Sequence, residues 1–265
     1  MITLLGIPLD VNSSYLPGPA EAPRKIREAF HCEASNAWSE SGIEVPVGAF
    51  ADEGDLPLRN TREAVGEDFA EIERAGGELL AKASQPIFLG GDHSITYPVL
   101  KAFAPRYRNL TIVHFDAHPD LYDEFEGSRT SHACPFARIM EAGLAARLIQ
   151  FGIRTLNRHQ REQAAKFGVE IVQMRDLPAF DRLNIAGPVY ISFDMDVLDP
   201  AFAPGVSHRE PGGMSVREAI AHLHAIEGKI VGADLVEYNP KQDISALTAG
   251  VAAKILREIM GKTGV

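Results

Sequence analysis

Short apolar runs alternate along the chain with longer stretches in which hydrophobic and polar residues follow a helical period. The apolar runs are rich in Ile, Val, Leu and Phe and show little polar alternation, which is typical of strands buried on both faces of a parallel sheet. We expect strands over residues 2–7, 44–48, 86–89, 110–115, 148–152, 169–172, 189–193 and 230–236.

Helix-length amphipathic stretches lie between these runs. We expect helices over residues 20–31, over 61–83, from 215 onwards and over 245–260. Two of these stretches begin with the spacing of a capping box, Asn60 with Glu63 and Ser215 with Glu218. The last helix is expected to bury one apolar face, made of Leu247, Val251, Ile255 and Ile259.

The order of these elements predicts the fold class. Strands that alternate with helices favour a three-layer α/β/α sandwich around a mostly parallel sheet of about eight strands. No stretch rich in Pro, Gly or Ser divides the chain, so residues 1–265 are expected to form a single domain. The stretches 10–20 and 119–132 are polar and rich in turn residues, and we expect them to be surface loops.

Composition and charge narrow the class of protein. Of the 265 residues 45% are hydrophobic, which excludes disorder as the main state. The formal charge is −10, from 36 acidic and 26 basic residues, which disfavours binding to a nucleic-acid backbone. No apolar run approaches the roughly 18 residues that span a bilayer. The N-terminus has no basic n-region, and two cysteines, Cys32 and Cys134, make no disulfide framework. We therefore expect a cytoplasmic protein without nucleic-acid or membrane partners.

Three of the expected strands end in clusters of potential metal ligands. The clusters are GGDHS over residues 90–94, HFDAHPD over 114–120 and SFDMDVLDP over 192–200. In an open parallel sheet, ligands bind outside the carboxyl ends of the strands. We therefore expect the three clusters to meet at one edge of the sheet.

Within two of the clusters the spacing itself brings ligands together, because side chains at i and i+2 of an extended segment share one face. Asp116, His118 and Asp120 can converge in this way, and so can Asp194 and Asp196. A single Asp after a strand is more often a turn or cap residue. Several buried carboxylates close together, however, are unfavourable unless cations neutralise them, so the clusters jointly favour a metal site.

The ligand set also indicates which metals fit. The six candidate ligands are His93, Asp116, His118, Asp120, Asp194 and Asp196. This mostly carboxylate set, with two imidazoles and no thiolate, suits Mn²⁺, and less specifically Fe²⁺, Co²⁺, Ni²⁺ or Mg²⁺. Six ligands are too many for one tetrahedral zinc and suit two metals bridged by carboxylates. Two divalent ions would bring the net charge of −10 to about −6.

Together these motifs resemble those of the ureohydrolase family, which includes arginases and agmatinases. The resemblance begins at residues 18–27 and continues through Asp234-Leu235-Val236-Glu237 to the C-terminal helix. Four shorter segments resemble plant-type arginases in particular, namely residues 125–127, 131–133, 136–141 and 203–208. The resemblance implies an arginase-like fold and a homo-oligomer, either a hexamer or a trimer.

The resemblance also implies roles at the matching positions. One Mn²⁺ would be held by His93, Asp116, Asp120 and Asp194, and the other by Asp116, His118, Asp194 and Asp196. His132 matches the family's loop histidine, a proton shuttle. Glu237 matches the acid that receives the guanidinium group of the substrate.

The same residue types suit the hydrolysis of a guanidinium group, whose carbon is a poor electrophile. Two metals can lower the pKa of a bridging water and present hydroxide at neutral pH. Asp120 can orient that hydroxide, and Asp120 and His132 are candidate proton donors to the leaving amine. Glu237 can accept two hydrogen bonds from the planar guanidinium. We therefore expect Asp120, His132 and Glu237 to be catalytic, with urea and an amine as products.

The tail of the substrate is harder to assign. Animal-type arginases have an acidic residue for the α-amino group directly after a G-x-R segment, whereas here residues 152–154 are followed by Thr155. Arg129, in the loop 120–132, is a candidate partner for a substrate carboxylate. We expect L-arginine to be the substrate, with agmatine and then 4-guanidinobutyrate as alternatives.

Two other classes of protein remain open. A catalytically silent member could bind guanidino ligands without turnover, although all six ligands and His132 are present. A metal-dependent deacetylase shares a related α/β architecture. The D-x-H-x-D and D-x-D motifs suit two transition metals better than the single zinc of such an enzyme.

Overall fold

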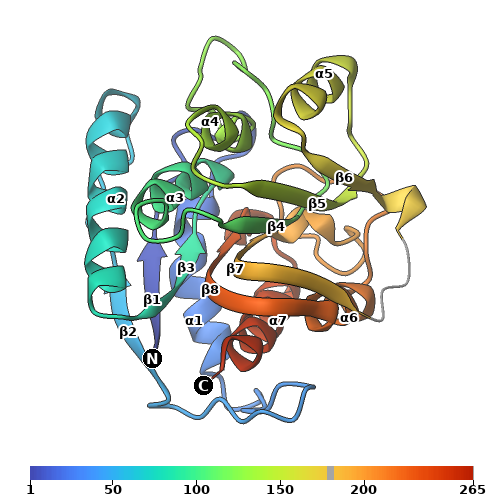
Figure 1. Cartoon of the computed structure of the whole chain (residues 1–265). Helices are drawn as coiled ribbons and strands as arrows, with labels where there is room; N and C mark the ends of the chain where they lie inside the picture. Colours follow the sequence, from blue (N-terminus) through green and yellow to red (C-terminus); the bar gives the residue numbers. More distant parts are fainter. Residues whose placement is uncertain (178–181, 265) are drawn as a thin grey trace.

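The computed structural model describes residues 1–177 and 182–264. Its strands form one sheet in the order β2-β1-β3-β8-β7-β4-β5-β6, and every neighbouring pair runs parallel (Figure 1). The strands are β1 (Ile2–Ile7), β2 (Phe50–Asp55), β3 (Gln85–Gly90), β4 (Thr111–Phe115), β5 (Arg147–Ile153), β6 (Glu170–Gln173), β7 (Leu183–Asp194) and β8 (Ile226–Val236). The predicted parallel sheet of about eight strands is confirmed.

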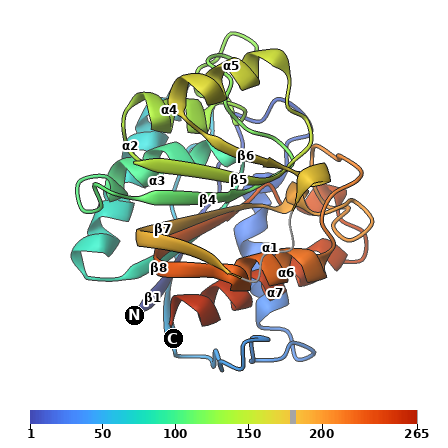
Figure 2. The same cartoon turned by 45° about the vertical axis from the view of Figure 1, so that its right-hand side comes forward.

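Helices cover both faces of this sheet (Figures 1 and 2). One layer contains α1 (Ala22–Phe30), α6 (Val216–Ala225) and α7 (Leu247–Thr263). The other layer contains α2 (Val65–Ala81), α3 (Thr96–Phe103), α4 (Pro135–Glu141) and α5 (Arg158–Phe167). Short 3-10 helices are η1 (Pro19–Glu21), η2 (Arg62–Ala64), η3 (His93–Ile95), η4 (Met174–Asp176), η5 (Met195–Val197) and η6 (Pro240–Gln242). The predicted three-layer α/β/α architecture is therefore confirmed.

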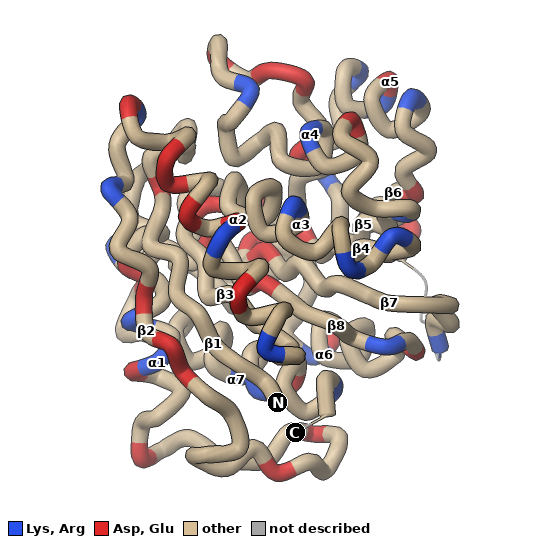
Figure 3. The backbone as a smooth tube through the Cα atoms, turned by 60° about the vertical axis from the view of Figure 1, so that its left-hand side comes forward, with Lys and Arg blue, Asp and Glu red and all other residues tan. Residues whose placement is uncertain are grey.

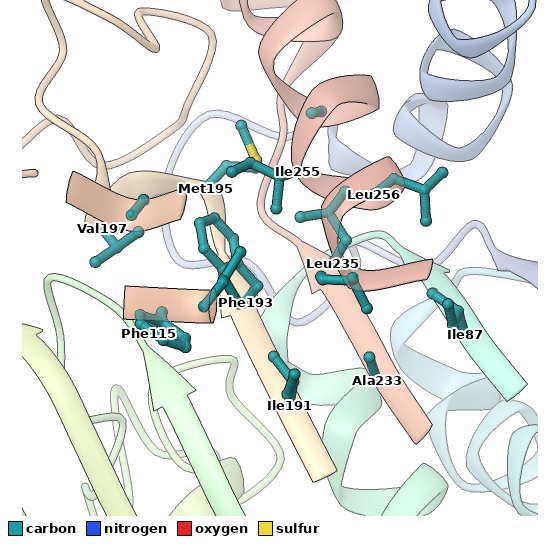
Figure 4. Close-up of a cluster of buried hydrophobic side chains, with 14 of the residues drawn as sticks. Ile87, Phe115, Ile191, Phe193, Met195, Val197, Ala233, Leu235, Ile255 and Leu256 are labelled. Carbon is teal, nitrogen blue, oxygen red and sulfur yellow. The ribbon is translucent and has the colours of Figure 1, made fainter. Parts of the chain in front are cut away.

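The core beneath α7 holds the central strands in place. Phe115 of β4, Phe193 of β7 and Leu235 of β8 are fully buried, and Figure 4 shows them beside Ile255 and Leu256 of α7. The rings of Phe115 and Phe193 lie 5.4 Å apart. Burial of each such side chain stabilises the fold by roughly 1.5–3 kcal/mol. Because the central strands are packed on both faces, their carboxyl ends present side chains from a rigid frame.

The second strand is not where the apolar pattern predicts it. Residues 44–48 were expected to form a strand, but β2 begins at Phe50 and has the polar sequence FADEGD. Within the predicted segment Val45 is buried in the core, but Pro46 has no backbone N–H to donate to a neighbouring strand. β2 lies at the edge of the sheet and pairs only with β1, so its exposed positions accept polar residues.

The predicted capping box at Asn60 is wrong. Asn60 adopts a positive φ of 53°, and its side-chain oxygen accepts the backbone N–H groups of Asp10 and Val11 at 2.8 and 2.9 Å. Thr61 precedes η2 and makes no side-chain cap. Asn60 thus connects the loop after β1 to the start of the helical segment, instead of capping that segment.

The predictions for the two C-terminal helices are confirmed in part. Ser215 and Glu218 form a complete capping box at the start of α6. On α7, Ile255 and Ile259 are fully buried, but Leu247 is 50% exposed because it is the first residue of the helix and extends beyond the core.

Lys and Arg are interspersed with Asp and Glu along the backbone (Figure 3). On α2, Arg74 pairs with Glu71 at 2.6 Å. Arg27 of α1 pairs with Asp52 at 2.8 Å and also with Asp55, which joins the helix to the edge strand β2. Within the described residues, no helix combines the length and hydropathy that a membrane crossing requires.

Candidate active site

The carboxyl ends of four central strands meet at one edge of the sheet. His93 lies just after β3, Asp116 directly follows β4, Asp194 ends β7 and Glu237 directly follows β8. Ligands of parallel α/β sheets bind at this edge. The three sequence clusters therefore converge as predicted.

The first group of ligand atoms surrounds one nitrogen. His93 Nδ1 lies 3.2 Å from Asp116 Oδ2 and 3.1 Å from both Asp120 Oδ2 and Asp194 Oδ2. All four side chains are buried. Nδ1 makes no well-directed hydrogen bond with any of these oxygens. An orphaned imidazole nitrogen that faces three carboxylates has the donor set of a cation site.

A second group shares Asp116 with the first. His118 Nδ1 lies 3.0 Å from Asp196 Oδ2 and 3.4 Å from Asp116 Oδ1. Asp116 thus presents one oxygen to each group, and Asp116, His118 and Asp196 are close enough to hold one ion. Asp194 offers Oδ2 to the first group, while its Oδ1 accepts the backbone N–H of Asp196 at 2.7 Å. The structure therefore brings all six predicted ligands together.

The carboxylates of this cluster would be stabilised by added positive charge. Burial, reinforced by the charges of Asp196 and Asp116, raises the pKa of Asp194 well above its ordinary value. Burial likewise raises the pKa of Asp196 to about 6, although His118 opposes this shift. Buried carboxylates with raised pKa values repel one another when ionised. The residues therefore fit a centre of divalent cations.

A buried hydrogen-bond chain orients His93. Its Nε2 lies 3.0 Å from Ser192 Oγ, and that hydroxyl donates to Asp234 Oδ1 at 2.7 Å. Tyr190 and Thr96 donate to the other oxygen of Asp234. With its Nε2 proton donated to Ser192, His93 keeps Nδ1 free as a ligand atom. Sequence reasoning gave Ser192 and Asp234 no such role, since only the fold places them behind His93.

His114 orients Asp116 in a similar way. Gln150 Nε2 lies 3.0 Å from His114 Nδ1, and His114 Nε2 lies 2.8 Å from Asp116 Oδ2. Burial lowers the pKa of His114, which favours a neutral ring that accepts at Nδ1 and donates at Nε2. The motif HFDAHPD contains this histidine, but its contact with Gln150 depends on the pairing of β4 with β5.

His132 and Glu237 form a buried pair beside the ligand cluster. His132 Nδ1 lies 2.8 Å from Glu237 Oε1, which also accepts the backbone N–H of His93 at 2.9 Å. Burial alone would lower the pKa of His132, but the charge and hydrogen bond of Glu237 raise it to about 9. Burial disfavours ionisation of Glu237, yet His132 holds its pKa below the ordinary value. Both contacts use Oε1, so Oε2 makes no hydrogen bond with the described residues.

Two of the predicted catalytic residues have unusual backbone conformations. Asp120 has φ 49° and Glu237 has φ 62°, in the left-handed region that non-glycine residues seldom adopt. The backbone of Glu237 is held by a hydrogen bond from its N–H to the Gly91 carbonyl at 2.9 Å. A Cβ on Gly91 would lie 1.8 Å from the carbonyl oxygen of Leu9, so glycine is required for this close approach.

Loops and the first turn of α5 form the outer wall of the pocket above the cluster. The wall is lined by Ser14, Tyr122, Phe125, Thr155, Gln160, His208 and Glu210. The stretches 10–20 and 119–132, predicted to be surface loops, thus contribute Ser14, Tyr122 and Phe125 to the site. Sequence reasoning missed Glu210, because no local spacing links it to the metal motifs, whereas His208 ends the segment 203–208 that resembles plant-type arginases.

Arg129 does not reach this wall. Its guanidinium pairs with Asp123 at 2.9 Å and with Glu141 at 2.8 Å, and its side chain is 46% exposed. It is not among the residues that line the pocket. This position gives no support to its predicted role as partner of a substrate carboxylate.

Comparison with known proteins identifies the family. The model of the arginase family matches residues 1–261. The chain belongs to the arginase family. Arginase 1, mitochondrial, from Arabidopsis thaliana is 46% identical over 274 residues, which cover 98% of this chain and 80% of the relative. The agmatinase of Bacillus subtilis (strain 168) is 36% identical over 264 residues, which cover 97% of this chain and 90% of the relative.

A solved structure supports the same assignment. The arginase from Medicago truncatula matches with a TM-score of 0.93 and 43% identity, covering 99% of this chain and 87% of that one. The predicted resemblance to plant-type arginases and the arginase-like fold are both confirmed. The residue roles within this arginase-family site stay predictions.

Proposed function

We propose that this protein hydrolyses the guanidinium group of L-arginine to give urea and L-ornithine. The 46% identity to a plant arginase over nearly the whole chain supports this substrate. The observation that carries the chemistry is that Glu237 lines a pocket together with four members of the ligand cluster, while both of its side-chain hydrogen bonds with described residues use Oε1 and none uses Oε2. That oxygen is a ready acceptor for a planar, cationic guanidinium.

We also propose two divalent cations, with Mn²⁺ first and Co²⁺, Ni²⁺ or Fe²⁺ as alternatives. His93, Asp116, Asp120 and Asp194 would hold one ion, and Asp116, His118, Asp194 and Asp196 the other. When bound, the ions supply the positive charge that makes a water acidic enough to act as a nucleophile. The orphaned Nδ1 of His93 and the buried carboxylates support this assignment.

The chain's own residues account for orientation and proton transfer. Glu237 Oε1 is held by His93 N–H and by His132, so Oε2 can fix the guanidinium in one orientation. Asp120, beside His93 Nδ1, can accept a hydrogen bond from the attacking water. In the metal-free chain the charge and hydrogen bond of Glu237 raise the pKa of His132 to about 9, so this pair favours a protonated His132 that can deliver its proton to the leaving amine.

Agmatine is the second candidate substrate. The Bacillus subtilis relative at 36% identity is an agmatinase. The pocket supports this alternative because no Lys or Arg is among the residues that line it, so the α-carboxylate of arginine has no fixed cation to meet there. The same feature disfavours 4-guanidinobutyrate, whose tail is a carboxylate.

The predicted homo-oligomer, a hexamer or a trimer, also remains a proposal. Large apolar side chains of Val47, Ile244 and Leu247 are exposed, which supports association between copies. Light scattering of the purified chain would test it, and a monomer at micromolar concentration would contradict it.

A substrate panel tests the function directly. The chain is loaded separately with each candidate metal and assayed for urea release from L-arginine, agmatine and 4-guanidinobutyrate. We expect the highest kcat/KM with L-arginine after Mn²⁺ loading. Metal loading without turnover of any guanidino compound would contradict the proposal and favour a binding protein. A stoichiometry of one metal per chain would contradict the two-ion centre and revive the deacetylase alternative.

A further inference from the structure

We propose that the carboxylate of Glu210 binds the ammonium group at the end of the substrate opposite the guanidinium. This inference rests on the proposed hydrolysis of a guanidino compound and deepens it. It assigns the substrate to the class whose tail carries an ammonium group, which includes L-arginine and agmatine.

Glu210 is the unassigned acid of the pocket. Five carboxylates line the cavity, those of Asp120, Asp194, Asp196, Glu210 and Glu237. The three aspartates belong to the ligand cluster, and Glu237 pairs with His132. Within the described part of the chain, the Glu210 carboxylate makes no hydrogen bond and no ion pair, although the residue is half-buried. A half-buried anion that faces a cavity without a partner is suited to a cationic ligand group.

The backbone of Glu210 is fixed relative to the ligand cluster. Arg154 donates to the Glu210 carbonyl from Nε at 3.0 Å and from Nη2 at 2.7 Å. Arg154 Nη2 also donates to the carbonyl of Asp196 at 2.7 Å. One guanidinium therefore ties the loop that carries Glu210 to the backbone of a proposed metal ligand.

The residues after Glu210 restrict the loop further. Gly212 and Gly213 donate their N–H groups to Asp199 Oδ2 at 2.6 and 3.1 Å, and Asp199 lies three residues after Asp196. The loop that carries Glu210 is thus attached to residues 196–199 at two points. Arg154 links the Glu210 carbonyl to the Asp196 carbonyl, and Asp199 accepts from Gly212 and Gly213. This preorganisation lets a single ion pair select a substrate tail.

The other residues of the pocket wall favour a cationic substrate tail over an anionic one. Thr155, at the position where animal-type arginases carry an acid, lines the same cavity but is neutral. Glu210 supplies an acid from a different loop, and no Lys or Arg among the lining residues balances it. An ammonium tail therefore gains an ion pair, whereas the carboxylate tail of 4-guanidinobutyrate meets a like charge.

The test is the variant Glu210→Gln in the full-length, Mn²⁺-loaded protein. We expect kcat/KM for L-arginine and agmatine to fall by about 10- to 100-fold, mainly through KM, because a charge-assisted hydrogen bond is lost. Turnover of 4-guanidinobutyrate should stay the same or rise. Glu124→Gln is the matched control, because Glu124 is an exposed acid of the loop 119–132 outside the pocket wall, and it should behave like the wild type.

Calorimetric titration with L-ornithine, putrescine and 4-aminobutyrate measures recognition of the tail without turnover. Glu210→Gln should weaken binding of the first two by about 10- to 100-fold and leave the third unchanged. An equal loss for all three compounds, or no loss for L-ornithine and putrescine, would overturn the inference, as would a wild type that binds neither L-ornithine nor putrescine. If no guanidino compound is hydrolysed but the binding pattern holds, the proposed function fails while the role of Glu210 stands.

Discussion

Ser192 offers a sharp test of how the fold prepares the proposed metal site, because its hydroxyl makes a hydrogen bond with His93 but with no other proposed cation ligand. Its hydroxyl lies between His93 Nε2, at 3.0 Å, and Asp234 Oδ1, at 2.7 Å. In Ser192→Ala the ring of His93 loses the partner that fixes its proton on Nε2. The proton can then occupy Nδ1, which faces three carboxylate oxygens at 3.1–3.2 Å and competes with a cation for the same position.

The magnitude follows from the hydrogen-bond chain. Loss of an outer-shell partner lowers metal affinity by about 10- to 100-fold, which corresponds to roughly 1.4–2.7 kcal/mol. The stabilisation by saturating metal falls by the same free energy. For a chain of this size, the rise in Tm on metal addition should shrink by roughly 3–8 °C.

Two measurements check this expectation. Chelator competition gives the affinity for Mn²⁺, and thermal unfolding with and without metal gives the stabilisation. Ser84→Ala is the matched control, since Ser84 is buried and donates to Thr3 Oγ1 at 2.7 Å without contact with the site. We expect it to lower stability by about 1 kcal/mol and to leave metal affinity unchanged. An affinity of Ser192→Ala within twofold of the wild type would refute the reasoning.

Three further predictions follow from the site. Asp116→Asn should lower metal affinity by more than about 100-fold, beyond the effect of an outer-shell partner, and abolish urea release; a variant that is active without metal would contradict the two-ion account. Gly91→Ala should destabilise the chain by about 3 kcal/mol or more in chemical denaturation, because a backbone carbonyl lies 1.8 Å from the new Cβ. The control Gly77→Ala in α2, with open space around it, should stabilise by about 0.5–1 kcal/mol. In the metal-free protein, the raised pKa of His132, about 9 against 6.5, contributes roughly 3 kcal/mol that is present below pH 6.5 and lost as the pH rises through 9. Chemical denaturation at pH 6 and pH 10 should show this loss in the wild type but not in the double variant His132→Gln/Glu237→Gln. An equal change in the free energy of unfolding of both proteins between the two pH values would argue against the buried ion pair.

The central strands could be predicted because burial on both faces leaves a simple pattern. β3 and β4 appear within one residue of their expected bounds, whereas β7 and β8 end within one residue of them but begin at Leu183 and Ile226, several residues before the predicted starts at 189 and 230. The edge strand β2 could not be found in this way, since one of its sides faces solvent and its sequence is polar. The short helices α3 and α4 were also missed, because eight and seven residues make only about two turns, too few to establish a helical period in the sequence.

The convergence of the six proposed metal ligands could be predicted for a similar local reason. Spacings such as D-x-H-x-D and D-x-D place side chains on one face before any tertiary contact forms. The groups that orient these ligands are different, because Ser192, Asp234 and Gln150 reach the site only through the order of strands in the sheet. Glu210 depends on a loop anchored by Arg154, a contact that no local pattern indicates.

The site concentrates features that oppose folding where the fold is best able to hold them. Several carboxylates are buried together, and Asp120 and Glu237 adopt left-handed backbone conformations that cost about 1–3 kcal/mol each. The strands that carry these groups are central ones, packed by helices on both faces (Figures 1 and 4). A strained, charged cluster at a flexible edge would relax by moving apart. Here the sheet prevents that movement, so bound cations would relieve the repulsion among the carboxylates, and the free energy of the proposed cation binding would add to the stability of the whole chain.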